Sequence, residues 1–115
     1  MDRHNQGKSG KSEVIVQFEK NISGWELRVV LSGELDHHNA AIIREEVDRE
    51  LDGSVKLLTL DMSGITFMDS SGIGVVLGRY RRMSESGGKL RMGGMSIYAE
   101  KILRMAGVLA LLERK

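Results

Sequence analysis

The sequence predicts one α/β domain built on a mixed, mainly parallel β-sheet, with elements in the order β-β-α-β-α-β-α and a possible further strand at the end. The chain has 115 residues, the size of a single domain. Two strand-like segments near its start are separated by a turn. After them, segments with helical periodicity alternate with short apolar segments. Such β-α-β units imply right-handed crossovers between parallel strands.

The composition excludes several classes of protein. The sequence contains no cysteine, which rules out disulfides and thiolate metal sites. A formal net charge of +1 gives no general attraction to nucleic acid or to an anionic membrane. No apolar run approaches the roughly 20 residues of a membrane span, and residues 1–11 lack the apolar core of a signal peptide. These features predict a cytoplasmic globular protein.

The two ends of the chain and the first hairpin have distinct patterns. Residues 1–12 are rich in polar residues, which is typical of a disordered leader, so we expect the folded domain to occupy residues 13–115. Apolar residues within 14–18 and 25–31 predict two strands, and Asn, Ser and Gly between them predict a hairpin turn. Residues 108–112 predict either a last edge strand or a packed tail.

Three helices are indicated by apolar residues that recur at three- and four-residue steps. They begin near Asn39, Ser70 and Ser96, and glycines stand where they should end. Residues 55–61 are apolar at nearly every position, as in a strand covered on both faces, and residues 89–92 predict another short strand. The expected apolar faces are Ala40, Ile43, Val47 and Leu51 in the first helix, Ile73, Val76, Leu77, Tyr80 and Met83 in the second, and Ile97, Ile102, Leu103 and Met105 in the third.

Acidic side chains follow two of the predicted strands. In an open parallel sheet, binding sites gather at the carboxyl ends of the strands. The strand that ends at Leu31 leads into residues 33–38, and the strand that ends near Asp61 leads into residues 67–72. Because these strands are expected to be adjacent and parallel, both segments should meet at one edge of the sheet. That edge is expected to hold two serines and four carboxylates, namely Ser70, Ser71, Glu34, Asp36, Asp61 and Asp69.

Ser70 and Ser71 have two interpretations. An Asp or Ser directly before an apolar helix commonly satisfies the free N–H groups of its first turn, which is a purely structural role. Alternatively, one of the two serines is a phosphoacceptor on an exposed corner. Phosphorylation would add about −2 charge at neutral pH, which a helix N-terminus tolerates but nearby carboxylates repel. It should therefore disturb a partner surface more than the fold.

Gly72, Gly74 and Gly78 fall in the opening turns of the second helix, where each glycine costs up to ~1 kcal/mol of helix stability. No lysine follows in the position that a nucleotide-binding loop requires, so a phosphate cradle is not indicated. We expect these glycines to permit close packing, either against the sheet or against the backbone of a partner.

Other polar clusters have simpler explanations. His37 and His38 are adjacent and the third histidine lies in the leader, which argues against a metal site. No Gly-x-Ser-x-Gly elbow surrounds the serines, so a serine hydrolase is poorly supported. Arg79, Arg81 and Arg82 are expected on a solvated helix face, where they could touch an acidic partner.

Several segments resemble the STAS-domain anti-sigma factor antagonists. Residues 33–40 read Gly-Glu-Leu-Asp-His-His-Asn-Ala and match a Gly-Glu-Leu-Asp segment of that family. Residues 67–80, which contain Met-Asp-Ser-Ser-Gly, carry the most specific part of the resemblance. Residues 87–88 and 102–107 also fit, so the likeness covers about residues 14–112. It is closer to the sporulation members of the family than to the stress-response members.

The resemblance implies a regulatory cycle with no catalytic activity, cofactor or metal of its own. The unphosphorylated antagonist binds an anti-sigma factor that is itself a serine kinase and so frees a sigma factor, here in sporulation control. The kinase phosphorylates the antagonist, which then lets go, and a serine phosphatase resets the cycle. The family's phosphoserine directly follows the aspartate, which is Ser70 here, with Ser71 as the alternative. The expected partner surface comprises Glu34, Asp36, Asp69, Ser71, Gly72 and Gly74.

Two other functions stay open on the sequence alone. A STAS module could bind a nucleotide or scaffold a larger complex without being phosphorylated, although a scaffold needs no hydroxyl after Asp69. A small enzyme could use Asp69 and Ser70 as a catalytic pair, although no positioned base accompanies them.

Overall fold

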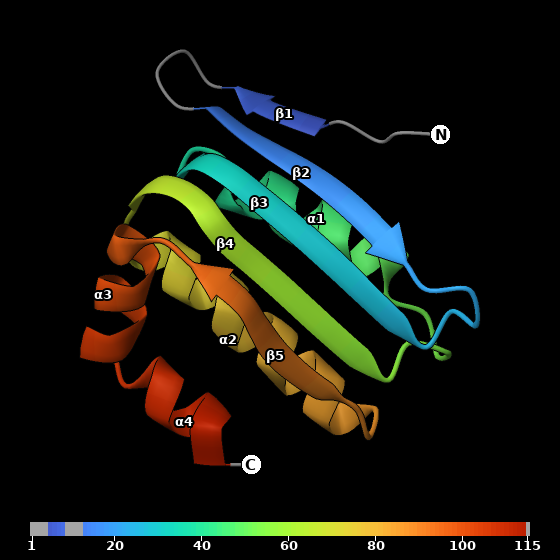
Figure 1. Cartoon of the computed structure of the whole chain (residues 1–115). Coiled ribbons are helices and arrows are strands. Elements are labelled where there is room, and N and C mark those ends of the chain that lie inside the picture. Colours follow the sequence, from blue (N-terminus) through green and yellow to red (C-terminus); the bar gives the residue numbers. More distant parts are fainter. Residues whose placement is uncertain (1–4, 9–12, 115) are drawn as a thin grey trace.

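The computed structural model describes residues 5–8 and 13–114 of the chain. Its elements, in chain order, are β1 (Asn5–Lys8), β2 (Glu13–Lys20), β3 (Glu26–Leu35), α1 (Ala40–Glu50), β4 (Leu57–Met68), α2 (Ser70–Glu85), β5 (Lys89–Met95), α3 (Ile97–Met105) and α4 (Val108–Arg114). The strands form one sheet in the order β1-β2-β3-β4-β5 (Figure 1). β1 and β3 pair with β2 in antiparallel orientation, whereas β4 pairs with β3 and β5 in parallel orientation. The predicted α/β fold with a mixed sheet is confirmed.

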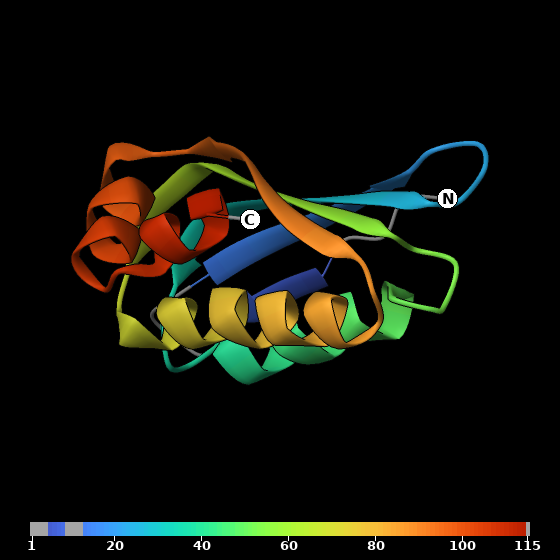
Figure 2. The same ribbon diagram turned by 90° about the horizontal axis from the view of Figure 1, so that it is seen from below.

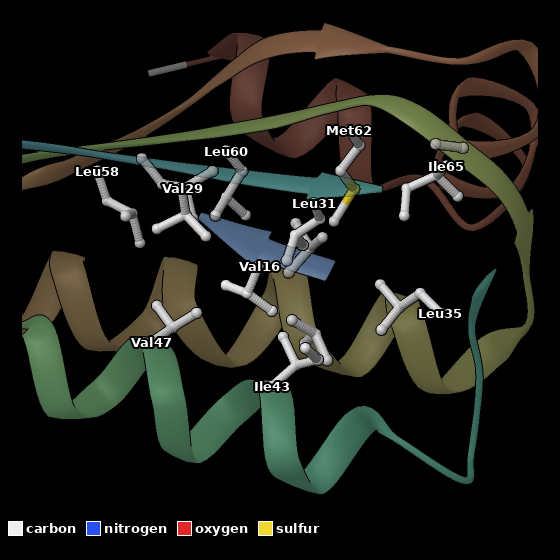
Figure 3. Close-up of a cluster of buried hydrophobic side chains, with 14 of the residues drawn as sticks. Val16, Val29, Leu31, Leu35, Ile43, Val47, Leu58, Leu60, Met62 and Ile65 are labelled. Atoms are coloured by element: carbon white, nitrogen blue, oxygen red, sulfur yellow. The ribbon is translucent and has the colours of Figure 1, made fainter. Parts of the chain in front are cut away.

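Helices α1 and α2 cover one face of the sheet, and α3 and α4 lie beside its β5 edge (Figures 1 and 2). The core lies between the sheet and the first two helices, where aliphatic side chains from both layers interdigitate (Figure 3). Val16, Leu31, Ile43, Val47 and Leu60 are fully buried there. Because such a core is close-packed, it fixes the ends of β3 and β4 relative to the helices that follow them.

The opposite face of the sheet carries a ladder of ion pairs. Arg28 on β3 pairs with Asp61 on β4, and its Nε lies 3.7 Å from the Glu19 carboxylate on β2. Arg91 on β5 reaches the Glu26 carboxylate on β3 at 3.2 Å. Opposite charges on neighbouring strands, as in the pair of Arg28 with Glu19, contribute roughly 0.2–1 kcal/mol. This face is therefore held by charges, in contrast to the aliphatic face beneath it.

The expectation that Asp61 joins the serines at the sheet edge is wrong. β4 continues to Met68, because residues 62–68 keep pairing with β3. Asp61 instead lies within the sheet, where hydrogen bonds from the Ser63 side chain and backbone hold the pKa of Asp61 below its ordinary value. The serine, glycine and threonine of residues 62–68 interrupt the apolar pattern and hid this half of the strand.

A strand occupies part of the segment expected to be a disordered leader. Asn5–Lys8 form β1 and pair with residues 13–16 at the free edge of β2. Residues 1–4 and 9–12 of the expected leader lie outside the described part of the chain. The sequence does not predict β1, because its residues, Asn-Gln-Gly-Lys, have weak strand propensity.

Residues 108–112 form helix α4 and not a last edge strand. Val108 and Leu109 are buried, and Leu112 is half-buried. Apolar residues at these spacings share one face of a helix, whereas a strand would send neighbours to opposite faces. No described helix has both the length and the apolar character needed to cross a membrane.

The arginine run of α2 divides between interior and solvent. Arg79 is only 7% exposed, and its Nε lies 3.0 Å from Asp48 Oδ1 on α1. Burial lowers the pKa of Arg79, and the nearby Asp48 opposes that effect. Arg81 and Arg82 are exposed, as predicted. The prediction of a solvated face is therefore wrong for Arg79, which joins the two helices.

Helix α3 packs through fewer residues than its sequence indicates. Ala99 and Leu103 are fully buried. Ile97 and Met105, which were expected on the apolar packing face, are 81% and 75% exposed. α3 packs mainly on β4 through the side that carries Ala99 and Leu103, and the side that carries Ile97 and Met105 is left exposed.

Candidate functional site

The ends of β3 and β4 meet at one edge of the sheet, as adjacent parallel strands predict. Leu35 and Met68 are partners at the last register position of the two strands. Beyond them, the Asp69 N–H donates to the Leu35 carbonyl at 3.3 Å. The His37 N–H donates to the Asp69 carboxylate, also at 3.3 Å. Hydrogen bonds therefore connect the two loops that follow these strands.

A glycine near the end of β3 shapes this edge. Gly33 has φ +102°, and a side chain at this position would collide with the backbone of Glu13 on β2. The register of β3 against β4 shifts between Gly33 and Glu34, as it does at a β-bulge. The glycine of the Gly-Glu-Leu-Asp segment is thus required by the backbone, and the irregularity reorients the acidic residues that follow.

Asp69 is the N-cap of α2. Its Oδ1 accepts from the Ser71 N–H at 2.8 Å, and its Oδ2 lies 3.5 Å from His37 Nδ1. Partial burial alone raises the pKa of Asp69, but hydrogen bonds from Ser71 and His37 outweigh it and hold the pKa below its ordinary value of 3.8. Asp69 is therefore a fixed negative charge at neutral pH, with both oxygens engaged.

Ser70 is the first residue of α2, and its side chain is exposed. Among the described residues, none hydrogen-bonds its hydroxyl, because Asp69 already supplies the cap. Ser71 is half-buried, and its N–H is held by Asp69. The capping role that the sequence suggested for this segment therefore belongs to Asp69. The hydroxyl of Ser70 is exposed at the surface and takes no part in the cap.

The three glycines of α2 have different surroundings. A side chain on the buried Gly72 would meet the side chain of Met68, so this glycine permits close packing against the end of β4. Gly74 and Gly78 have nothing within 4 Å of the position a Cβ would occupy. Packing against the sheet thus accounts for Gly72 alone. Gly74 and Gly78 leave a bare strip on α2 that a partner backbone can approach.

Asp36 and Asn39 lock the loop between β3 and α1. Asp36 is 8% exposed and Asn39 is fully buried. Asn39 Oδ1 accepts from the Asp36 N–H at 3.1 Å, and its Nδ2 donates to the Glu34 carbonyl at 2.7 Å. Asp36 Oδ1 accepts from the His38 N–H at 2.9 Å. The side chain of Asp36 is therefore enclosed by its own loop and exposes little surface.

Asn39 is the site residue that the sequence interpretation did not single out. It appeared only as the start of a helix, although an Asp three residues before an Asn, directly ahead of an apolar helix, is a pattern that favours local side-chain-to-backbone bonds. Its side chain joins the Glu34 and Asp36 backbones, so it sets the shape of the acidic loop.

The remaining polar residues at this edge are more accessible. Glu34 is half-buried, whereas His37 and His38 are exposed, and their rings lie with centroids 4.0 Å apart and planes tilted by 37°. His38 Nδ1 lies 3.6 Å from Asp36 Oδ1. Within residues 5–8 and 13–114, no three His, Cys, Asp or Glu side chains are grouped to hold a metal ion. The edge is a surface of carboxylates and imidazoles around one exposed hydroxyl.

The family model of the STAS domain matches residues 14–114, which span β2 to α4 and include the whole of this edge. The chain belongs to the STAS domain family. The anti-sigma F factor antagonist of Paenibacillus polymyxa is 36% identical to it over 83 residues, 71% of either chain. This relative places the STAS domain described here among the anti-sigma factor antagonists.

Solved STAS structures share the fold. The unphosphorylated form of the anti-sigma factor antagonist SpoIIAA superposes with a TM-score of 0.71 at 30% identity, over 81% of either chain. SpoIIAA of Bacillus in its phosphorylated form gives 0.65 at 30% identity, over 83% of this chain and 86% of that one. The anti-sigma-B factor antagonist of Bacillus subtilis (strain 168) is 26% identical over 86 residues, 75% of either chain. The anti-sigma-B antagonist is thus the more distant relative, in the order that the sequence predicted.

Proposed function

We propose that this STAS domain is an anti-sigma factor antagonist controlled by phosphorylation of Ser70. In its unphosphorylated form it binds an anti-sigma factor that is also a serine kinase, and so frees the sigma factor. The kinase transfers the γ-phosphoryl group of ATP to the Ser70 hydroxyl, and the complex dissociates. A serine phosphatase restores the active form. The cycle operates in the cytoplasm, in sporulation control, and the STAS domain contributes no catalysis.

The exposed Ser70 hydroxyl at the first position of α2 carries the proposal. Because Asp69 caps the helix, the fold does not use this hydroxyl, and a kinase can reach it. Ser71 is the alternative acceptor, but it is half-buried and its N–H is held by Asp69. The similarity to an anti-sigma F factor antagonist, and to SpoIIAA, whose structure is known in unphosphorylated and phosphorylated forms, supports control by phosphorylation.

A phosphate on Ser70 is expected to weaken the complex more than the fold. It adds about −1.5 to −2 charge at pH 7, and the first turn of α2 stabilises an anion through its N–H groups and dipole. In the free domain, water screens this charge from the Asp69 carboxylate. In a complex that covers Ser70, water is excluded and the repulsion between the phosphate and Asp69 increases. Phosphorylation should therefore reduce affinity, by roughly 5–150-fold if the coupling is typical.

Incubation with the cognate anti-sigma kinase and ATP, followed by intact-mass measurement, tests the assignment. The wild-type chain and Ser71→Ala should each gain one phosphate, and Ser70→Ala should gain none. Ser70→Ala should also stay bound to the kinase in the presence of ATP, whereas the wild type dissociates. Labelling that persists in Ser70→Ala and disappears in Ser71→Ala would move the acceptor by one residue. A chain that binds the kinase and is never labelled would instead support a non-phosphorylated STAS module.

A further inference from the structure

Helix α3 exposes a second apolar face. Ile97, Tyr98 and Met105 are 81%, 58% and 75% exposed, and Ile102 at the margin of this face is half-buried and packs partly against the core. Residues 98, 102 and 105 follow the four- and three-residue steps that place side chains on one side of a helix, and residue 97, eight positions before 105, lies next to them on that side. A helix of nine residues thus contributes three of the large apolar side chains that this domain exposes. Exposed apolar residues that share one face, unlike scattered ones, mark an interaction surface.

The fold of α3 does not depend on this outward face. Ser96 caps the helix by accepting from the Ala99 N–H at 3.1 Å. Ala99 and Leu103 are fully buried on the opposite side and join the core. The helix is therefore anchored by a cap and by small and branched side chains that point inward. Its outward apolar residues are left for another molecule.

The outward face belongs to the same end of the domain as Ser70. β4 and β5 are parallel, so the helices that follow them, α2 and α3, start at the same edge of the sheet (Figure 1). The Ser96 N–H donates to the Met62 carbonyl of β4 at 3.1 Å, and α3 packs on β4 and touches α2. Phe67, near the end of β4, is 48% exposed and adds apolar surface at this end. A protein that covers Ser70 can therefore extend onto α3.

The charge on this face indicates which partner fits. Lys101 is exposed, and residues 97, 101 and 105 are each about one turn apart, so Lys101 stands on the same side of the helix as Ile97 and Met105. A partner protein with an apolar groove and an acidic side chain opposite Lys101 would satisfy both features.

We propose that the outward face of α3, formed by Ile97, Tyr98, Lys101, Ile102 and Met105, is a second docking surface for the anti-sigma kinase. The inference rests on the proposed function and extends it. This surface provides affinity that does not change when Ser70 is phosphorylated, because its apolar contacts carry no switchable charge. The kinase therefore recognises its substrate partly through α3, and the phosphorylation of Ser70 decides whether the complex holds or dissociates.

Calorimetric titration of the kinase with three chains tests the proposal. The double variant Ile97→Ser/Met105→Ser should bind at least about tenfold more weakly than the wild type, as expected for loss of apolar anchors. Ile22→Ser is the matched control, because Ile22 is fully exposed on the β2–β3 hairpin at the other end of the sheet. It should bind as the wild type does. Lys101→Glu should also weaken binding, whereas Lys89→Glu, an exposed lysine at the start of β5, should not.

The outcomes separate the two proposals. If the kinase binds the wild type and the α3 variants equally, the α3 surface is refuted and the Ser70 cycle stands. If the kinase binds none of them, both proposals are refuted. Sedimentation velocity tests whether a second copy of the chain binds this face instead of the kinase. A wild-type dimer that Ile97→Ser/Met105→Ser dissociates, with kinase affinity unchanged, would assign the face to a second copy and overturn the proposal.

Discussion

The first turns of α2 and α3 start at the same edge of the sheet and are built alike, yet they present different chemistry. Asp69 caps α2 and Ser96 caps α3, each through its side chain. After the cap, α2 exposes Ser70, whereas α3 exposes Ile97 and Tyr98. In both helices the side chain of the residue before the helix accepts a hydrogen bond from a backbone N–H of the first turn. The side chain of the first helical residue is therefore not needed to cap the helix.

The difference between these two turns suggests a division of labour. In the proposed cycle, phosphorylation converts the hydroxyl of Ser70 into a dianion beside an ionised Asp69, so its contribution to binding can be switched. The apolar side chains of α3 carry no such chemistry, and their contribution stays constant. A surface that combines both can hold its partner firmly and still release it on phosphorylation.

The largest expected effect comes from changing both turns at once. Ser70→Asp should lower kinase affinity by roughly 5–150-fold, and Ile97→Ser/Met105→Ser by at least about tenfold. If the two turns act independently, the triple variant should lose the product of the two factors, within about 0.5 kcal/mol. Calorimetry on the four chains measures this. An affinity for the triple variant no lower than that of Ser70→Asp would show that the two turns are not independent.

Asn39→Ala should cause the largest loss of stability among the changes proposed at the acidic edge. It leaves the Glu34 carbonyl and the Asp36 N–H without the partners that the buried amide supplies. Such loss typically costs about 1–3 kcal/mol. Urea denaturation of Asn39→Ala is best compared with that of His37→Ala, an exposed neighbour whose loss should change the free energy of unfolding by no more than about 0.5 kcal/mol. Equal free energies of unfolding for the two variants would contradict the claim that the Asn39 side chain stabilises the loop between β3 and α1.

Removing either cap should have a smaller and similar effect. Asp69→Ala and Ser96→Ala each leave an N–H of the first helical turn unsatisfied, which costs about 1 kcal/mol. Ser70→Ala should change the free energy of unfolding by less than about 0.5 kcal/mol, because the cap does not use its hydroxyl. Urea denaturation at pH 7 measures all three. A loss for Ser70→Ala as large as for Asp69→Ala would show that the hydroxyl has a structural role.

The smallest expected effect is a difference between the two caps in how their contribution to stability depends on pH. The pKa of Asp69 is lowered in the folded state, so its contribution to stability is complete above about pH 5 and is lost as the pH falls below about 4, through the folded-state pKa. The Ser96 hydroxyl does not titrate in this range. The stability difference between wild type and Asp69→Ala should therefore shrink from pH 6 to pH 3, whereas that for Ser96→Ala should not. Parallel shrinkage in both variants would contradict the assigned ionisation of Asp69.

Local patterns predicted the order of the main elements and the position of the candidate serine. The steps between Ala40, Ile43 and Val47 fix α1, and an Asp-Ser-Ser-Gly segment before an apolar run fixes the start of α2. The meeting of the two acidic loops also followed, because it needs only two adjacent parallel strands. These inferences depend on spacing along the chain, which the sequence displays directly.

The features that the sequence did not predict depend on contacts between distant segments. Asp61 is placed within the sheet by the pairing of β4 with β3 beyond it. Arg79 is buried because Asp48 on another helix faces it at 3.0 Å. Ile97 and Met105 are exposed because only one face of α3, the face with Ala99 and Leu103, packs against the core. Periodicity marks a residue as apolar, but the packing of the whole chain decides which apolar residues are covered.

The most direct test of the account is the affinity of the anti-sigma kinase for the chain phosphorylated stoichiometrically on Ser70, measured beside that of the unmodified chain. Far-ultraviolet circular dichroism and urea denaturation of both samples establish that the fold is the same. The account predicts an unchanged fold and an affinity that is lower by roughly 5–150-fold. Equal affinities, or a loss that accompanies unfolding of α2, would contradict the claim that Ser70 switches the surface and leaves the fold intact.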